Sequence, residues 1–156
     1  MIKQHNYFVK KQVKVEFSVT EHPSFASGEL ATGSYGLGVY LPDNAIITNC
    51  FYDVLTTFVD GDDDSATIAL TANSAADLKA AIAISDGGNV WDQGLHGCLP
   101  GNWALDGNAL TAIAMAAARS GSFVKTTAER ELTVTVADDA LTAGKMVIYL
   151  EYVVSE

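Results

Sequence analysis

Two segments far apart in the chain alternate apolar and polar residues without a break. They are residues 11–19 and residues 131–137. A period of two is typical of a β-strand with one buried face, and it excludes an amphipathic helix at these positions. The side chains expected to face inward are Val13, Val15, Phe17, Val19, Leu132, Val134 and Val136.

Four further segments read as strands, because they are rich in β-branched and aromatic residues and carry no helical stripe. They are residues 39–41, 45–59 (with a bulge near Asp53), 66–71 and 146–154. The last is apolar on nearly both faces. A strand covered in this way is expected to be central in its sheet or to meet a partner chain.

The segments between the strands are rich in glycine and turn-forming residues. Residues 20–38 are predicted to be mostly loop, residues 138–145 a turn-rich connector, and residues 86–108 a long irregular loop with six glycines. Loops of this length in compact domains are usually functional or lie at an interface.

One short helix is expected over residues 74–83, where Ser74 can cap the first turn and Leu78 faces Ile82 four residues later. The Ala-Ile part of this segment is open to a strand reading. Residues 109–118 are equally compatible with a helix and a buried strand.

This pattern predicts a mainly β protein, an antiparallel β-sandwich or jelly-roll-like fold with one short helix. A chain of 156 residues suits a single domain. We assign residues 1–11 to a basic N-terminal arm and residues 12–156 to one β-sandwich domain.

Charge is unevenly distributed along the chain. Residues 1–15 carry four lysines and no acid, while the other five cations and all nineteen acids follow, so a net charge of −10 divides into +4 and −14. The acidic balance argues against a nucleic-acid partner, whose phosphates need clustered Lys and Arg. The first residues lack the apolar core of a signal peptide, and no apolar run is long enough to span a membrane. We therefore expect a soluble protein made in the cytoplasm.

The arm and the glycine-rich loop supply the candidate partner-binding residues. An arm with aromatic and basic residues is suited to reach a neighbouring subunit, although it could equally pack on its own chain. The tryptophans could be exposed anchors, or they could fold inward and hold the loop on the sheet. The candidates are His5, Tyr7, Phe8, Lys10, Lys11, Trp91 and Trp103.

Residues 58–70 (FVDGDDDSATIAL) contain an acidic turn. An EF-hand register starting at Asp60 fails, because Ser65 stands where Gly is needed and Thr71 where Glu is needed. A hairpin tip explains the same residues without a metal, so no metal site is assigned. Cys50 and Cys98 have no metal spacing; Cys50 is expected to be a small buried residue, and a bridge between the two has no support in the sequence.

The sequence contains no catalytic signature. GxSxG and HExxH are absent, and the three histidines fall in predicted loops or near the terminus. We expect neither enzymatic activity nor a cofactor.

Several strand-and-turn phrases resemble small structural proteins of tailed bacteriophages. They are YGLGVYLP (35–42), AII (45–47), DVLTTF (53–58), SATIAL (65–70), LTAGK (141–145) and YLEYV (149–153).

The resemblance implies a β-rich virion component, such as a decoration or cement protein that binds and stabilises the assembled head. It implies the major capsid protein as partner, a homo-oligomer with a trimer as one option, location in the virion, and no active site. The alternative is a carbohydrate- or receptor-binding module of a virion fibre or tail, with the tryptophans and the acidic turn at its site.

Overall fold

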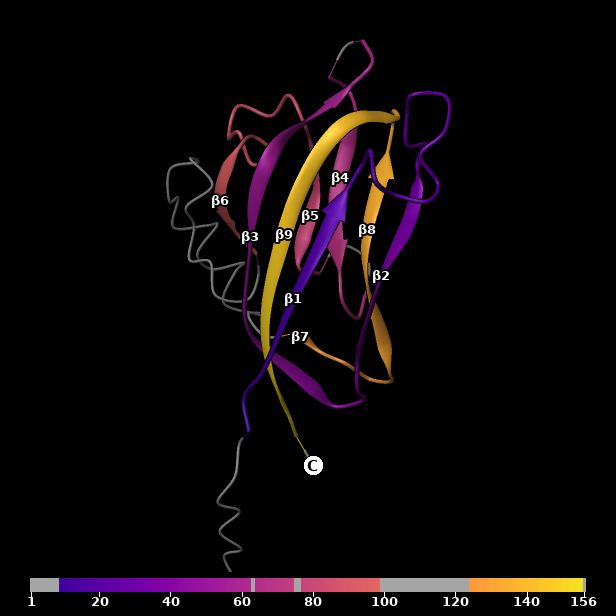
Figure 1. The fold of residues 1–156 in the computed structure, drawn as a ribbon. Helices are drawn as coiled ribbons and strands as arrows, with labels where there is room; N and C mark the ends of the chain where they lie inside the picture. The colour runs from indigo at the N-terminus through magenta and orange to yellow at the C-terminus, as the bar shows by residue number, and fades with distance from the viewer. Residues whose placement is uncertain (1–8, 63, 75–76, 99–123, 156) are drawn as a thin grey trace, which may run out of the picture.

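The computed structural model describes residues 9–62, 64–74, 77–98 and 124–155, and these residues form two antiparallel sheets and no helix. The first sheet has the order β1 (Lys11–Ser18), β9 (Leu141–Val154), β3 (Ala45–Asp60) and β6 (Gly94–Gly97), and β7 (Val124–Lys125) also pairs with β3. The second has the order β2 (Gly33–Leu41), β8 (Arg130–Ala137), β4 (Thr67–Thr71) and β5 (Lys79–Ala83). Figure 1 shows the two sheets as layers of one sandwich, and their strand order is jelly-roll-like. The predicted mainly β, antiparallel sandwich is confirmed.

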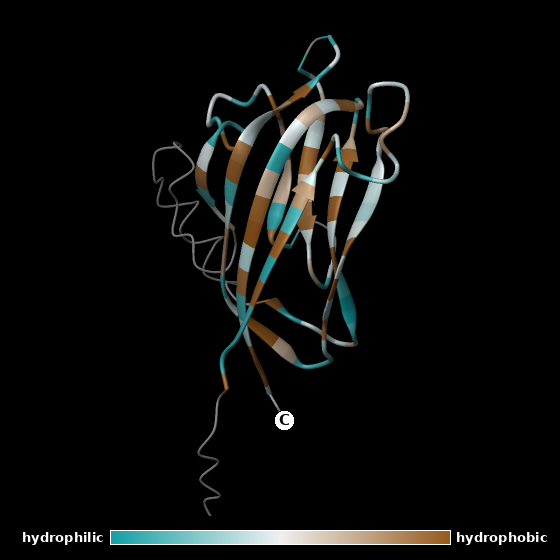
Figure 2. Cartoon of the chain, viewed as in Figure 1, coloured by the Kyte–Doolittle hydropathy of each residue, from teal (hydrophilic) through white to brown (hydrophobic). Residues whose placement is uncertain are grey.

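The core lies between the sheets and is formed by the inward residues of the alternating strands. Figure 2 shows this alternation as changes of colour along the strands. On β8, Leu132, Val134 and Val136 are buried while the threonines between them are partly exposed, as predicted. On β1, Phe17 is buried and stands on the inward side of its strand.

β9 is an interior strand of the first sheet. It pairs with β1 on one side, with Lys14 opposite Tyr149, and with β3 on the other, with Phe51 opposite the same tyrosine. The prediction that this apolar strand is central is therefore confirmed. β9 begins at Leu141, so the predicted connector over residues 138–145 is shorter than expected.

The helix predicted over residues 74–83 is wrong where the structure describes it. Lys79–Ala83 form β5, which pairs antiparallel with β4. The carboxylate of Asp77 accepts hydrogen bonds from the backbone N–H groups of Ala72, Asn73 and Ser74 at 2.7–2.9 Å. The Asp77 carboxylate therefore stabilises a loop with the residues before it and not the first turn of a helix. The alanines that follow belong to β5, the edge strand of the second sheet.

Two predicted loops contain strands. β2 begins at Gly33, six residues before the predicted strand, and β6 lies inside the 86–108 segment. Glycine has a low strand propensity, so β2 forms through its pairing with β8, and β6 forms through its pairing with β3. The 109–118 segment lies outside the described residues.

The acidic turn connects the two sheets instead of forming a hairpin, because β3 belongs to the first sheet and β4 to the second. Figure 1 shows this connection at one end of the sandwich, with the start of β1 and the C-terminal residues at the other. Lys11, assigned to the arm from sequence, is the first residue of β1.

Candidate partner-binding face

A row of four paired residues crosses the outer face of the first sheet. Lys14 on β1 lies opposite Tyr149 on β9, which lies opposite Phe51 on β3, which lies opposite Gly97 on β6. The rings of Phe51 and Tyr149 are stacked, with centroids 4.9 Å apart, and the Lys14 ammonium lies 5.8 Å from the Tyr149 centroid. We call these four residues the aromatic row.

The aromatic row borders a shallow hollow of about 340 Å³. Both rings are half-buried, so they present apolar surface to the outside. Polar groups of neighbouring strands complete the wall. The lining residues are Gln12, Val13, Lys14, Phe51, Tyr149, Leu150 and Glu151.

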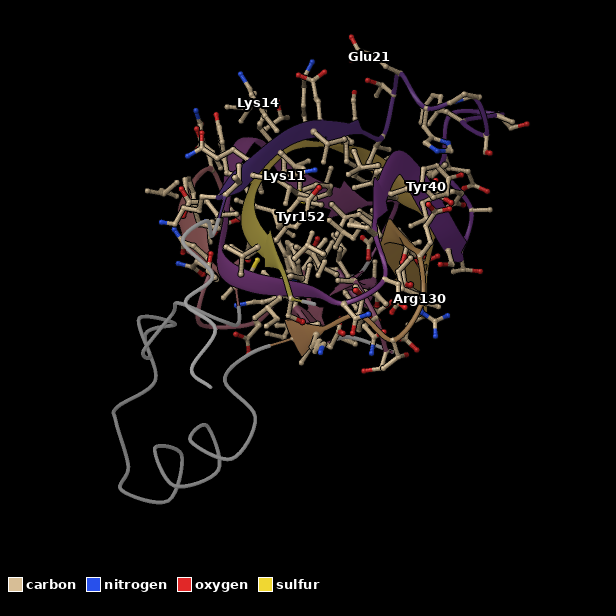
Figure 3. All side chains as sticks on the ribbon, turned by 90° about the horizontal axis from the view of Figure 1, so that it is seen from below. Lys11, Lys14, Glu21, Tyr40, Arg130 and Tyr152 are labelled. Carbon is tan, nitrogen blue, oxygen red and sulfur yellow. The ribbon has the colours of Figure 1, made fainter. Side chains whose placement is uncertain are left out.

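The last residues of the N-terminal arm lie at the rim of this hollow. The Nζ atom of Lys10 forms an ion pair with Glu151 at 3.0 Å, and Gln12 Nε2 donates to the same carboxylate at 2.8 Å. The hydrogen bonds from Gln12 and Lys10 lower the pKa of Glu151, although some desolvation opposes them. Figure 3 shows Lys14 pointing away from the sandwich and Tyr152 lying between the sheets, which separates the outer and inner faces. Lys10, at the end of the arm, and the hollow thus share one surface.

Trp91 is not available to a partner in this structure, because its side chain is fully buried. Its ring packs on Tyr52 at 5.2 Å between centroids and meets Phe58 edge-on at 6.0 Å. Its Nε1 donates to the carbonyl of Ile82 at 3.0 Å. The alternative that this tryptophan folds inward and holds its loop on the sheet is the one observed. His5, Tyr7, Phe8 and Trp103 lie outside the described residues.

Asp60 organises the acidic loop through backbone hydrogen bonds. One carboxylate oxygen accepts from the N–H groups of Asp62 and Asp64 at 3.4 and 3.0 Å, and the other accepts from Ala66 at 3.1 Å. Burial raises the pKa of Asp60, but the backbone hydrogen bonds together outweigh it and hold that pKa below its ordinary value. Carboxylate oxygens of Asp60, Asp62 and Asp139 lie within 4.8 Å of one another. The backbone bonds account for the conformation of Asp60 without a cation.

The described histidines have structural partners. His22 meets the ring of Tyr35 edge-on at 4.7 Å between centroids. His96 hydrogen-bonds the carbonyl oxygen of Asp92 at 2.8 Å and stacks on Tyr52 at 5.3 Å. Neither contact pairs a base with a nucleophile. The described residues also contain no helix that could span a bilayer.

Sequence reasoning missed the aromatic row. The signal was present, because alternation along β9 places Tyr149 and Glu151 on the face opposite Leu150. Phe51 could not be paired with Tyr149 from sequence alone, because the register of β3 against β9 shifts at four places.

Comparison with known proteins finds similarity in solved structures. No protein-family model matches the chain, and no curated protein matches it. A chain of the Cyanophage Pam1 capsid asymmetric unit aligns with a TM-score of 0.59 and 13% identity, over 99% of this chain and 92% of that one.

Two other capsids contain chains of similar fold. One is the acid-stable capsid of Helicobacter pylori bacteriophage KHP30, with a TM-score of 0.55, 11% identity, and coverage of 95% of this chain and 90% of that one. The other is the capsid of Ralstonia phage GP4, with a TM-score of 0.57, 16% identity, and coverage of 100% and 92%. At these identities the similarity shows a shared fold.

Proposed function

We propose that this chain is a non-enzymatic structural protein of a tailed-bacteriophage virion, and that it decorates or cements the assembled head. Three chains that share its fold belong to phage capsids. The proposed partner is the major capsid protein, and the chain is proposed to act as a homo-oligomer. A protein that binds the assembled lattice and not the free subunits stabilises the lattice by mass action.

The observation that carries the binding mode is the continuity of arm and hollow. The root of the arm is tied to Glu151 by Lys10, beside the stacked rings of Phe51 and Tyr149. Aromatic side chains bury large apolar areas at interfaces, and lysines around them can pair with acidic groups of a partner. Residues 1–8, including His5, Tyr7 and Phe8, together with Lys10 and Lys11, are proposed to extend this contact over the capsid surface.

Occupancy on heads that lack the protein tests the proposal. Full-length protein is compared by co-sedimentation with a deletion of residues 1–8 and with the double variant F51S/Y149S. Both changes leave β1 and its pairing with β9 in place, so folding can be verified by circular dichroism. The matched control is Tyr40→Ser, an exposed aromatic residue of β2 in the other sheet. Figure 3 shows Tyr40 and Lys14 on different sides of the molecule.

We expect both changes to reduce occupancy at least tenfold, with Y40S close to wild type. Normal occupancy of both altered proteins would reject the arm and the hollow as the contact. Failure of the wild-type protein to bind heads would reject the decoration function itself.

A second candidate function is saccharide binding in the same hollow. Stacked rings next to Gln12, Lys14 and Glu151 combine an apolar platform with hydrogen-bonding groups, which suits a sugar ring. A glycan array, read with and without a chelator, distinguishes the two functions. Glycan binding that is lost in F51S/Y149S would favour the receptor-binding module. Absence of glycan binding would reject that module and leave capsid binding as the remaining proposal.

A further inference from the structure

Cys50 and Cys98 occupy opposite positions across the β3–β6 ladder. Phe51 pairs with Gly97, so one step further along the antiparallel register places Cys50 beside Cys98. The backbone N–H of Cys98 donates to the carbonyl of Cys50 at 3.1 Å. Directly opposed residues of an antiparallel pair have Cα atoms about 4.5–5.5 Å apart, depending on the type of pair. That spacing lies within the range of about 4.4–6.8 Å that a disulfide requires.

The two thiols also face the same side of the sheet. Each cysteine is 1% exposed, and both belong to the core cluster. A hydrogen bond between the thiols, together with burial, raises the pKa of Cys50 well above its ordinary value. Both thiols are free in this structure.

We propose that Cys50 and Cys98 form an intrachain disulfide when the protein meets a low-molecular-weight disulfide such as oxidised glutathione. One cysteine loses its proton, and its sulfur attacks a glutathione sulfur, releasing one glutathione thiol and leaving a mixed disulfide. The second cysteine then attacks the protein sulfur of that bond and releases the second glutathione. Two protein thiols are oxidised and one glutathione disulfide is reduced to two thiols, so protons and electrons balance.

The position of the pair determines when the reaction occurs. β6 is a four-residue strand at the edge of its sheet, where local opening is easiest. The buried thiols react slowly while β6 stays paired, since the thiolate is the attacking species and burial disfavours it. A reducing cytoplasm keeps them free, and an oxidising surrounding favours the bond. The product fixes β6 on β3 covalently. This inference is independent of the proposed function.

Mass spectrometry of the full-length protein tests the proposal. Reduced protein is incubated under native conditions with oxidised or reduced glutathione, acid-quenched, denatured and alkylated. With oxidised glutathione, we expect wild type to lose both alkylation sites, to carry no glutathione, and to yield a linked peptide pair containing Cys50 and Cys98. It should run as a single chain on a non-reducing gel. The variants C50S and C98S should each end with one alkylated or glutathione-bearing cysteine.

Thermal melting provides a second measurement. The oxidised wild type should melt several degrees above the reduced protein, and neither serine variant should show an oxidant-dependent shift. Wild type that stays doubly alkylated after prolonged oxidation would overturn the proposal. A stable mixed disulfide or a disulfide-linked dimer as the main product would also overturn it. These outcomes are measured on the wild type alone, so they remain decisive if a serine variant folds poorly.

Discussion

The ring of Phe58 on β3 lies against the backbone of Gly144 on β9, where an added Cβ would overlap its carbon atoms. Gly144 also has a φ of 144°, a conformation that L side chains rarely adopt. Glycine is therefore required at this position by both contact and backbone conformation, near the end of the β3–β9 pair, where the register shifts between Thr56 and Val59.

Substitution of this glycine is expected to destabilise the fold. G144A should lower the free energy of unfolding by about 1–3 kcal/mol, since it overpacks a core contact. Urea denaturation measures the loss. The matched control is G28A, because Gly28 also has a positive φ (91°) but has no atom within 4 Å of the added Cβ. Equal losses in the two variants would show that the Phe58 contact contributes nothing.

Thr126 holds the loop before β3 through a buried hydroxyl. Its Oγ1 donates to the carbonyl of Pro42 at 2.6 Å and accepts from the N–H of Ala45 at 2.8 Å. T126V keeps the shape and removes both bonds, so we expect a loss of about 1–3 kcal/mol in unfolding free energy. T126S keeps the hydroxyl and should lose clearly less. A valine variant as stable as the wild type would show that the two hydrogen bonds contribute nothing.

Asp60 should make stability depend on pH. Its folded pKa lies below its ordinary value because backbone N–H groups bind the ionised form. A lowered pKa means that the stabilisation is complete above the unfolded pKa of about 3.9 and is lost as pH falls through the folded pKa. D60N should unfold more easily at pH 7, by about 1–3 kcal/mol, because one backbone N–H loses its acceptor.

Unfolding midpoints in urea between pH 7 and pH 3 test this expectation. The gap between wild type and D60N should narrow as the pH falls below 4. A constant gap over the whole range would show that ionisation of Asp60 is not what stabilises the loop. Calcium added at pH 7 is expected to leave the wild-type melting temperature unchanged.

Trp91 should behave as a buried fluorophore. The chain has two tryptophans, so W103F leaves Trp91 alone. Its emission is expected to be blue-shifted relative to free tryptophan and resistant to acrylamide quenching, since the ring packs between Tyr52 and Phe58. Quenching as fast as that of free tryptophan would contradict the buried position. W91F should also destabilise the fold, by about 1–3 kcal/mol, because the carbonyl of Ile82 loses its donor.

The sequence predicts the strands whose own side chains decide their conformation. β1 and β8 alternate strictly, and β9 is apolar on both faces, so their type and orientation were predictable. The sequence of β5 is open between helix and strand, and that of β6 does not predict a strand, because alanine and glycine carry little periodic information and these strands form through pairing with β4 and β3. Asp77 is a helix-favouring residue by position, but its carboxylate binds the N–H groups of residues that precede it.

The candidate partner-binding face is formed by residues that lie far apart in the sequence. The lysines of the arm were predictable as a basic cluster, whereas the Phe51–Tyr149 stack requires the register between two strands about a hundred positions apart. Trp91 illustrates the same point, since a tryptophan in a glycine-rich segment is compatible with both exposure and inward packing until its packing partners are known.

The register that places Lys11 beside Tyr152 has a consequence for biosynthesis. β1 emerges from the ribosome early, and among the described strands β9, on which it pairs, is translated after all the others. The edges of β1 and β3 that pair with β9 therefore stay unpaired through most of translation. The first sheet can form completely only after β9 leaves the ribosomal exit tunnel. A ribosome stalled before β9 should hold a chain that is sensitive to protease and bound by chaperones.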